Sequence, residues 1–370
     1  MPIDDLKTPL RPRGMDAVAW WLWTLVGMIF IMAVVGAITR LTESGLSIME
    51  WEPLSGSIPP LSQARWQEYF ALYQTIDEFK VQWQGEMTLD EFKNIFWWEW
   101  GHRQWGRLIG LVAIFGLIFL WAQGKMSVGM RVHGVVIILG LIAQGALGWF
   151  MVASGFMEGL TDVSSVRLAM HLSLALILYA YVFLLAMGQT FGPLTDDDLA
   201  VGGEGLRWAR IAVIALMVVL SITIISGALV AGSNAGVGFN GFPLMASQLF
   251  PLGYWDEPTW WDVFTKNVIA IQFNHRLMAT ISLVSALGIG VAIVLQKRRW
   301  GRRLSAPAHA VAGWVVVQYI LGVATLLMSS AAVPVSMGAL HQAGAIVLLS
   351  LLCWLTYALF SQAKVTSKSQ

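Results

Sequence analysis

Long apolar stretches recur along the chain and alternate with polar segments. Eight of them carry few or no charged residues over about 20 positions, the length that an α-helix needs to cross the hydrocarbon core of a bilayer. They cover residues 18–39, 105–121, 132–151, 168–187, 208–230, 271–295, 308–328 and 338–360. The pattern therefore predicts an all-α polytopic membrane protein with eight transmembrane helices.

The polar segments differ in their content of basic residues. Lys and Arg gather before the first apolar stretch, in alternate connections and after the last stretch, at Lys7, Arg11, Arg13, Lys125, Arg131, Arg207, Arg210, Lys297, Arg298, Arg299, Arg302, Arg303, Lys364 and Lys368. Because cytoplasmic connections are enriched in Lys and Arg, both termini are predicted to be cytoplasmic. The two long segments, 42–101 and 231–270, are then outside. The first fifteen residues lack the apolar core of a cleavable signal, which favours a bacterial cytoplasmic (inner) membrane.

The first long segment contains a helix start signal. Thr88-Leu89-Asp90-Glu91 has the pattern of a capping box, in which the first and fourth side chains bond each other's backbone N–H. It predicts a helix that runs through Phe96 towards the second apolar stretch. We expect this capping box to have a structural role only.

The two halves of the chain carry matching residues. The matches are Gly36-Ala37 with Gly227-Ala228, His102-Arg103 with His275-Arg276, QGALG at 144–148 with QYILG at 318–322, and His171 with His341. Each half holds four apolar stretches, so the chain ends each half on the side of the membrane where it began, and both halves have the same orientation. We predict two pseudo-symmetric four-helix bundles, over 18–190 and 207–361, flanked by a cytoplasmic segment at 1–17 and a cytoplasmic tail at 362–370.

Composition supports a membrane protein and excludes several functions. Only 12% of the residues are charged and 57% are hydrophobic, whereas a soluble protein has roughly a quarter charged. The formal net charge of +1 provides no basic field for nucleic acid. The single cysteine, Cys353, excludes an intramolecular disulfide and any multi-cysteine metal site. Metal chemistry would therefore depend on the six histidines.

The predicted topology divides the histidines by depth. His102, His171, His275 and His341 lie near the outer ends of the second, fourth, sixth and eighth stretches, whereas His133 and His309 begin stretches at the cytoplasmic side. Two histidines at one depth in one bundle can bind a haem iron from both faces. The alternative is that each histidine only bonds a neighbouring carbonyl. We favour haem ligation for the four outer histidines and the alternative for the other two.

An arginine follows one outer histidine in each half. Arg103 and Arg276 would lie at the membrane surface, where haem propionates emerge, and a guanidinium can bind both oxygens of a carboxylate. The other interpretation is an ordinary interfacial anchor. We expect the propionate role for both.

The halves differ three residues before this histidine. Glu99 precedes His102, whereas Gln272 precedes His275. Residues three apart share a helix face, so Glu99 is expected to overhang the site of His102. A carboxylate can transfer a proton or stabilise a developing cation, but an amide cannot. The first half is thus expected to perform the chemistry and the second to store electrons. A di-iron site is excluded because Gln272 removes the second Glu-x-x-His motif.

Several segments together resemble the haem A synthase family. They are GAITRLTESGLSIMEWEPLSGSIPP at 36–60, EWGHRQWGRLIG at 99–110, the stretch around His171, AGSNAGVGFNGFPLM at 231–245, FNHR at 273–276 and MGALHQAGA at 337–345. The resemblance covers residues 17–360. It implies an oxidoreductase that converts haem O to haem A for cytochrome oxidase, oxidising a methyl substituent to a formyl group through hydroxylated intermediates.

The resemblance also implies roles for the candidate residues. His102 and His171 would flank the substrate haem O, His275 and His341 would ligate a haem b cofactor, and Glu99 matches the family acid beside the substrate. The outer segments lack the cysteine pairs of some bacterial members, so the chain resembles the cysteine-free proteobacterial and mitochondrial type. The implied partners are haem O, membrane lipid, haem O synthase and cytochrome oxidase assembly factors. The oligomeric state is left open.

Two other functional classes account for part of the pattern. A dihaem b-type carrier between a quinol and another protein would use the same four histidines, but it gives no reason for Glu99 opposite Gln272. A secondary transporter would explain the repeat, yet the halves lack matched Gly or Pro interruptions near mid-membrane. The sequence does not reveal the oxygen source or the electron partner.

Overall fold

The computed structural model describes residues 14–52, 55–191, 204–295 and 297–361, and this part of the chain is helical without a β-strand. Eight of its helices are long and apolar enough to cross a membrane. They are α1 (Ala17–Leu41), α4 (Leu89–Ala122), α5 (Val128–Val152), α6 (Ser165–Phe191), α7 (Glu204–Gly232), α9 (Val268–Leu295), α10 (Lys297–Met328) and α11 (Val335–Phe360). The predicted all-α polytopic fold is confirmed.

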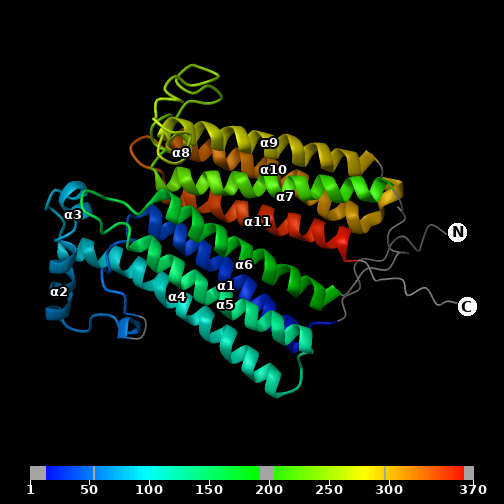
Figure 1. Ribbon diagram of the computed structural model, residues 1–370, viewed down its shortest axis with the longest axis horizontal. Coiled ribbons are helices and arrows are strands. Elements are labelled where there is room, and N and C mark those ends of the chain that lie inside the picture. Colours follow the sequence, from blue (N-terminus) through cyan, green and yellow to red (C-terminus); the bar gives the residue numbers. More distant parts are fainter. Residues whose placement is uncertain (1–13, 53–54, 192–203, 296, 362–370) are drawn as a thin grey trace, which may run out of the picture.

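Both long connections lie at the same end of the helices (Figure 1). The first, residues 42–101, is called the cap here; it contains η2 (Ser55–Ser57), α2 (Gln63–Tyr73), α3 (Asp77–Gln82) and the first turns of α4. The second, residues 233–267, is called the second loop and contains α8 (Trp260–Thr265). Helix α1 begins and α11 ends at the opposite end (Figure 1), as an even number of crossings requires.

The helices of each half contact one another in a ring. Helices α1 and α5 each pack against α4 and α6, and helices α7 and α10 each pack against α9 and α11 in the same order. Helices α1, α6, α7 and α11 join the halves. The bundle boundaries and pseudo-symmetry remain predictions. The basic residues at 1–13 and 362–370, and the side chains at 297–303, on which the orientation partly rests, lie outside the described parts.

The cap holds the extended start of α4. Thr88 and Glu91 form the predicted capping box, with both reciprocal hydrogen bonds present. Helix α4 therefore begins at Leu89, well before the apolar stretch at 105–121. Its first turns bury Phe92 and Phe96 against Tyr73 of α2 and Phe79 of α3. This aromatic core holds α2 and α3 on α4 beyond the end of the bundle.

The repeat extends to the backbone of the two connections. Glu43 and Asn234 both have left-handed φ angles, 52° and 54°, which are uncommon for residues other than glycine. The offset between them, 234 − 43 = 191, also relates Gly36 to Gly227. The chain therefore leaves α1 and α7 through the same turn.

Candidate functional site

Each of the four outer histidines packs against a glycine on a neighbouring helix. A Cβ atom placed on the glycine would lie 2.8–3.0 Å from the histidine Cε1, closer than real Cβ contacts allow. The pairs are Gly36 with His102, Gly148 with His171, Gly227 with His275, and Gly322 with His341. The four rings thus occupy equivalent seats, and a side chain at any of these glycines would require the histidine ring to shift.

His275 and His341 face each other inside the second half. Their ring centroids are 6.4 Å apart and their planes are inclined by 86°. A metal bound between two imidazoles through bonds of roughly 2 Å would hold the ring centres about 6 Å apart. The observed spacing would therefore suit two imidazole ligands of one iron.

Hydrogen bonds orient the His275 ring. Its Nδ1 lies 3.2 Å from the Thr223 carbonyl oxygen and 3.0 Å from the Ser226 hydroxyl. Because a carbonyl oxygen only accepts, this contact requires a proton on Nδ1 and leaves the Nε2 lone pair available for a metal. His341 lies beside Gln318, which donates to the His341 carbonyl at 2.8 Å.

The first half has a similar pair with one clear difference. Gln144 donates to the His171 carbonyl at 3.0 Å, as Gln318 does to that of His341. His102 and His171 are close enough to interact electrostatically. The Nδ1 of His102 is buried and has no hydrogen-bond partner among the described residues. In this respect His102 differs from His275, whose Nδ1 bonds the Thr223 carbonyl.

The two remaining histidines have local partners. His133 Nδ1 lies 2.7 Å from the hydroxyl of Tyr181, and His309 Nδ1 contacts the carbonyl of Ser305 one turn earlier. Neither ring belongs to the glycine-seated set.

Glu99 and Arg103 hold the cap against α4. Glu99 is buried, and its Oε2 accepts hydrogen bonds from the Ser47 hydroxyl at 2.7 Å and the Ile48 N–H at 2.8 Å. Its Oε1 pairs with Arg103 Nη2 at 2.6 Å. Arg103 also donates to the carbonyls of Ile48 and Glu50.

The second half has the same arrangement in matching register. Arg276 donates to the carbonyls of Phe239 and Gly241, each 191 positions after the acceptors of Arg103. Its Nη2 also donates to Gln272 Oε1, 3.1 Å away. In each half, a pair one helical turn apart thus fixes the connection that follows the first helix. The first pair, Glu99 and Arg103, is an ion pair, whereas the partner of Arg276 in the second pair is the neutral Gln272.

Comparisons with known proteins identify the family of the chain. The chain matches the cytochrome oxidase assembly protein family over residues 19–353. It is 42% identical to the protein named Heme A synthase of Rhodospirillum centenum over 93% of this chain and 88% of that one. It is 43% identical to the Heme A synthase of Granulibacter bethesdensis over 92% and 86%. The chain belongs to the haem A synthase family.

This member of the haem A synthase family has site features that sequence reasoning missed. The glycines were noticed only as marks of the repeat, and their role as histidine seats depends on which helices face each other. Thr223 and Ser226 lie four and one positions before Gly227, and neither belongs to a recognisable sequence motif. The predicted roles of Glu99, Arg103 and Arg276 towards haem remain predictions.

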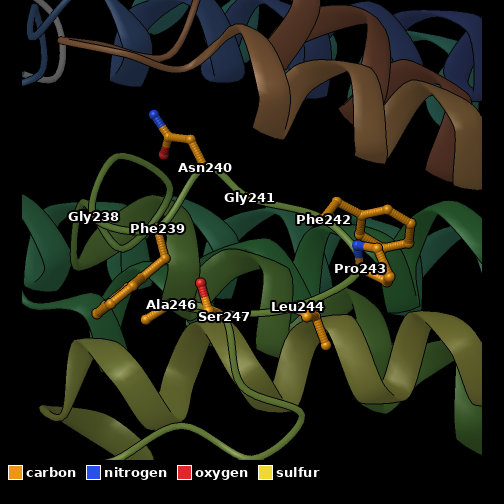
Figure 2. Close-up of a pocket in the computed structure, with 9 residues that line it drawn as sticks. All are labelled: Gly238, Phe239, Asn240, Gly241, Phe242, Pro243, Leu244, Ala246 and Ser247. Carbon is orange, nitrogen blue, oxygen red and sulfur yellow. The ribbon is translucent and has the colours of Figure 1, made fainter.

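The second loop of this haem A synthase family member borders an open hollow of about 470 Å³ (Figure 2). Residues 238–244, 246 and 247 line it, and none of the predicted site residues is among them. Asn240 points away from Ala246 and Ser247 in Figure 2, and its amide donates to the Ser329 carbonyl after α10. The hollow is therefore a feature of the loop that Arg276 holds, separate from the histidine seats.

Proposed function

We propose that the protein is a haem A synthase, an oxidoreductase that oxidises a methyl substituent of haem O to a formyl group through hydroxylated intermediates. The observation that carries the proposal is the set of four glycine-seated histidines, two in each half, in a chain that belongs to this family. Four equivalent seats are more than isolated structural histidines need. They suit two flat iron macrocycles, one for each half.

The second half is proposed to hold the haem b cofactor between His275 and His341. The residues fit this group because their rings are 6.4 Å apart and the Thr223 carbonyl fixes His275 with Nε2 free for a metal. Haem b, when bound, supplies one-electron transfer. The Nε of Arg276 is buried without a partner among the described residues and is the donor that we assign to a propionate.

The first half is proposed to bind the substrate, haem O, between His102 and His171. The unpartnered Nδ1 of His102 supports a ligand role, because a buried ring without another bond gains from binding a metal. Arg103 anchors the cap beside this site and is assigned, like Arg276, to a propionate.

Glu99 is proposed to act on the methyl group being oxidised. Its carboxylate lies three residues before His102 and is fixed by Ser47, Ile48 and Arg103. A carboxylate held in one position can stabilise positive charge that develops on the substrate or accept its proton. Gln272 can do neither, which assigns the oxidation to the first half.

The eight spans support a place in a membrane. We propose that the protein lies in the bacterial cytoplasmic membrane with both termini in the cytoplasm. The cap, the second loop and the four histidines then lie towards the periplasmic surface.

The pigments bound to the purified protein test this function. Haems are extracted and identified by mass after production with and without a haem O synthase. A haem A synthase should carry haem O, hydroxylated forms or haem A in addition to haem b when the haem O synthase is present. A preparation that contains only haem b under both conditions would instead identify a dihaem electron carrier.

The role of Glu99 is tested by Glu99→Gln. We expect haem content close to wild type and haem A formation reduced by a factor of 100 or more, the scale of losing one acid–base or electrostatic group. The matched control is Gln272→Glu, which adds the carboxylate to the other half and should not create a second oxidation site. Normal haem A formation by Glu99→Gln at unchanged haem content would remove Glu99 from the reaction.

A further inference from the structure

The second loop exposes large apolar side chains in one continuous stretch. Leu249 and Leu252 are 84% and 77% exposed, and Phe250, Trp255, Trp260 and Trp261 are each at least half exposed. Between residues 244 and 261 the only charged side chains are Asp256 and Glu257. A soluble surface rarely carries so many neighbouring apolar groups unless something covers them.

Specific contacts hold this stretch in place, so its exposure is not the result of a loose loop. Phe250 and Tyr254 both pack on Phe273 of α9, at ring-centroid distances of 5.2 and 5.7 Å. The Tyr254 hydroxyl donates to Asn274 at 2.9 Å, and Asn267 donates to the Gly253 carbonyl at 2.9 Å. One side of the stretch is therefore fixed to α9, and the other side faces outwards.

The position of the loop indicates what it faces. In Figure 1 the second loop projects sideways past α9 at the cap end of the bundle, on the side away from α7 and α10. Below it, α9 exposes its own apolar side chains, including Leu277, Val284 and Val291, as a membrane helix does towards lipid. The exposed stretch therefore continues the lipid-facing surface of α9 beyond its first turn.

We propose that residues 249–261 lie in the bilayer interface on the cap side, with Leu249 and Leu252 directed into the acyl chains. Tryptophan is enriched at this level because its ring is apolar and its N–H is polar, and the loop presents Trp255, Trp260 and Trp261 there. The partner is the lipid surface itself. The stretch carries no basic residue, so zwitterionic lipid is sufficient and anionic headgroups are not required.

The cap provides a contrast within the same chain. Val81 of α3 is 61% exposed, but α3 lies beyond the end of the bundle in Figure 1 and carries the accessible ion pair of Asp77 with Lys80. An equally accessible apolar residue there should be surrounded by water. Val81 is thus the matched control for Leu252.

The test measures the surroundings of a fluorophore attached to the full-length protein. Leu252→Cys and Val81→Cys are labelled with bimane in nanodiscs of phosphatidylcholine. The native Cys353 is buried, and the protein without an introduced cysteine, treated with bimane in the same way, measures any background labelling of Cys353. A nitroxide near the top of the lipid acyl chain should quench the label at position 252 at least threefold more than the label at 81. Aqueous iodide should give the opposite order.

Two results would overturn the proposal. Strong iodide quenching at 252, equal to that at 81, would place the loop in water. Protection of 252 from both quenchers would show that protein, such as a second copy of the chain, covers the stretch. Leu249→Cys repeats the measurement at a second position, and unchanged haem content verifies that each labelled variant is folded. Because the readout does not depend on turnover, it separates this inference from the proposed enzymatic function.

Discussion

Glu78 lies inside the cap on α3, where only 3% of the residue is exposed. Its Oε2 has no hydrogen-bond partner among the described residues. Burial, together with the nearby Asp162, Glu43 and Glu99 and against the opposing charge of Arg40, raises the pKa of this carboxyl group to about 9. The folded cap therefore holds Glu78 protonated at neutral pH, whereas the unfolded segment would ionise it.

This shift predicts how the stability of the cap depends on pH. The folded state binds one more proton than the unfolded state between about pH 4.5 and pH 9, so the stability present below this range is lost as pH rises through it. In the wild-type protein the free energy of unfolding of the cap should fall by an amount on the order of 3 kcal/mol between pH 5 and pH 8, and Glu78→Gln should abolish this fall. Limited proteolysis of the cap across this range measures it. The exposed Glu86→Gln is the control, and an unchanged pH slope in Glu78→Gln would contradict the shift.

Single residues also mark the limit of what the sequence alone predicts. The four outer histidines could be selected because the repeat and the predicted topology place them at one depth. Glu78 could not, because its burial depends on α2 and α3 folding back onto α4. The contacts of Glu99 with Ser47 and Ile48 likewise could not be predicted from the sequence, because they join residues about fifty positions apart.

At the scale of elements, local signals and apolar length gave different information about α4. The capping box at Thr88 correctly predicted where the helix begins, because it depends on four consecutive residues. The apolar stretch begins only at Trp105, because Glu99 and Arg103 interrupt the turns directly before it. Those turns are helical but lie in the cap, where one face is aromatic and the other is solvated.

The pairing of neighbouring helices gives a second prediction. A Cβ at Gly322 of α10 would lie 2.8 Å from His341 on α11, whereas a Cβ at Gly313 on the same helix would meet nothing within 4 Å. Gly322→Ala should displace the His341 ring at a cost of about 1–3 kcal/mol, which weakens haem b binding roughly 5- to 150-fold. Gly313→Ala should leave it unchanged. Haem b per protein, measured from the pyridine haemochrome spectrum, compares them; equal occupancy would mean that the seat does not position His341.

On the scale of the whole molecule, polar contacts connect the two halves at the cap end. Arg40 lies in the last turn of α1. Its guanidinium forms an ion pair of 3.2 Å with Asp162, which lies in the connection between α5 and α6, and donates a hydrogen bond of 2.9 Å to Asn234 of the second loop. Asn234 also donates to Asp162 at 3.0 Å. Deeper in the bundle, Gln342 of α11 donates to the Ala33 carbonyl of α1. The two histidine pairs are therefore held in a fixed relation, as the proposed electron transfer between two haems would require.

This arrangement predicts that the two halves bind haem independently but turn over only together. His341→Ala removes one of the two imidazoles that are 6.4 Å apart in the second half, so haem b should be lost. His102 and His171 belong to the other half and keep their seats, so haem O should still bind when haem O synthase is produced in the same cells. Haem A formation should nevertheless fall below detection, because the proposed route for electrons passes through haem b.

His171→Ala should give the reverse result, with haem b retained and haem O absent. His309→Ala is the matched control, because His309 contacts Ser305 and belongs to neither pair. Haem types identified by mass and the spectrum of the reduced protein distinguish the three variants. If His341→Ala continued to form haem A at the wild-type rate, the second half would have no part in the oxidation, and the duplicated histidines would need another explanation.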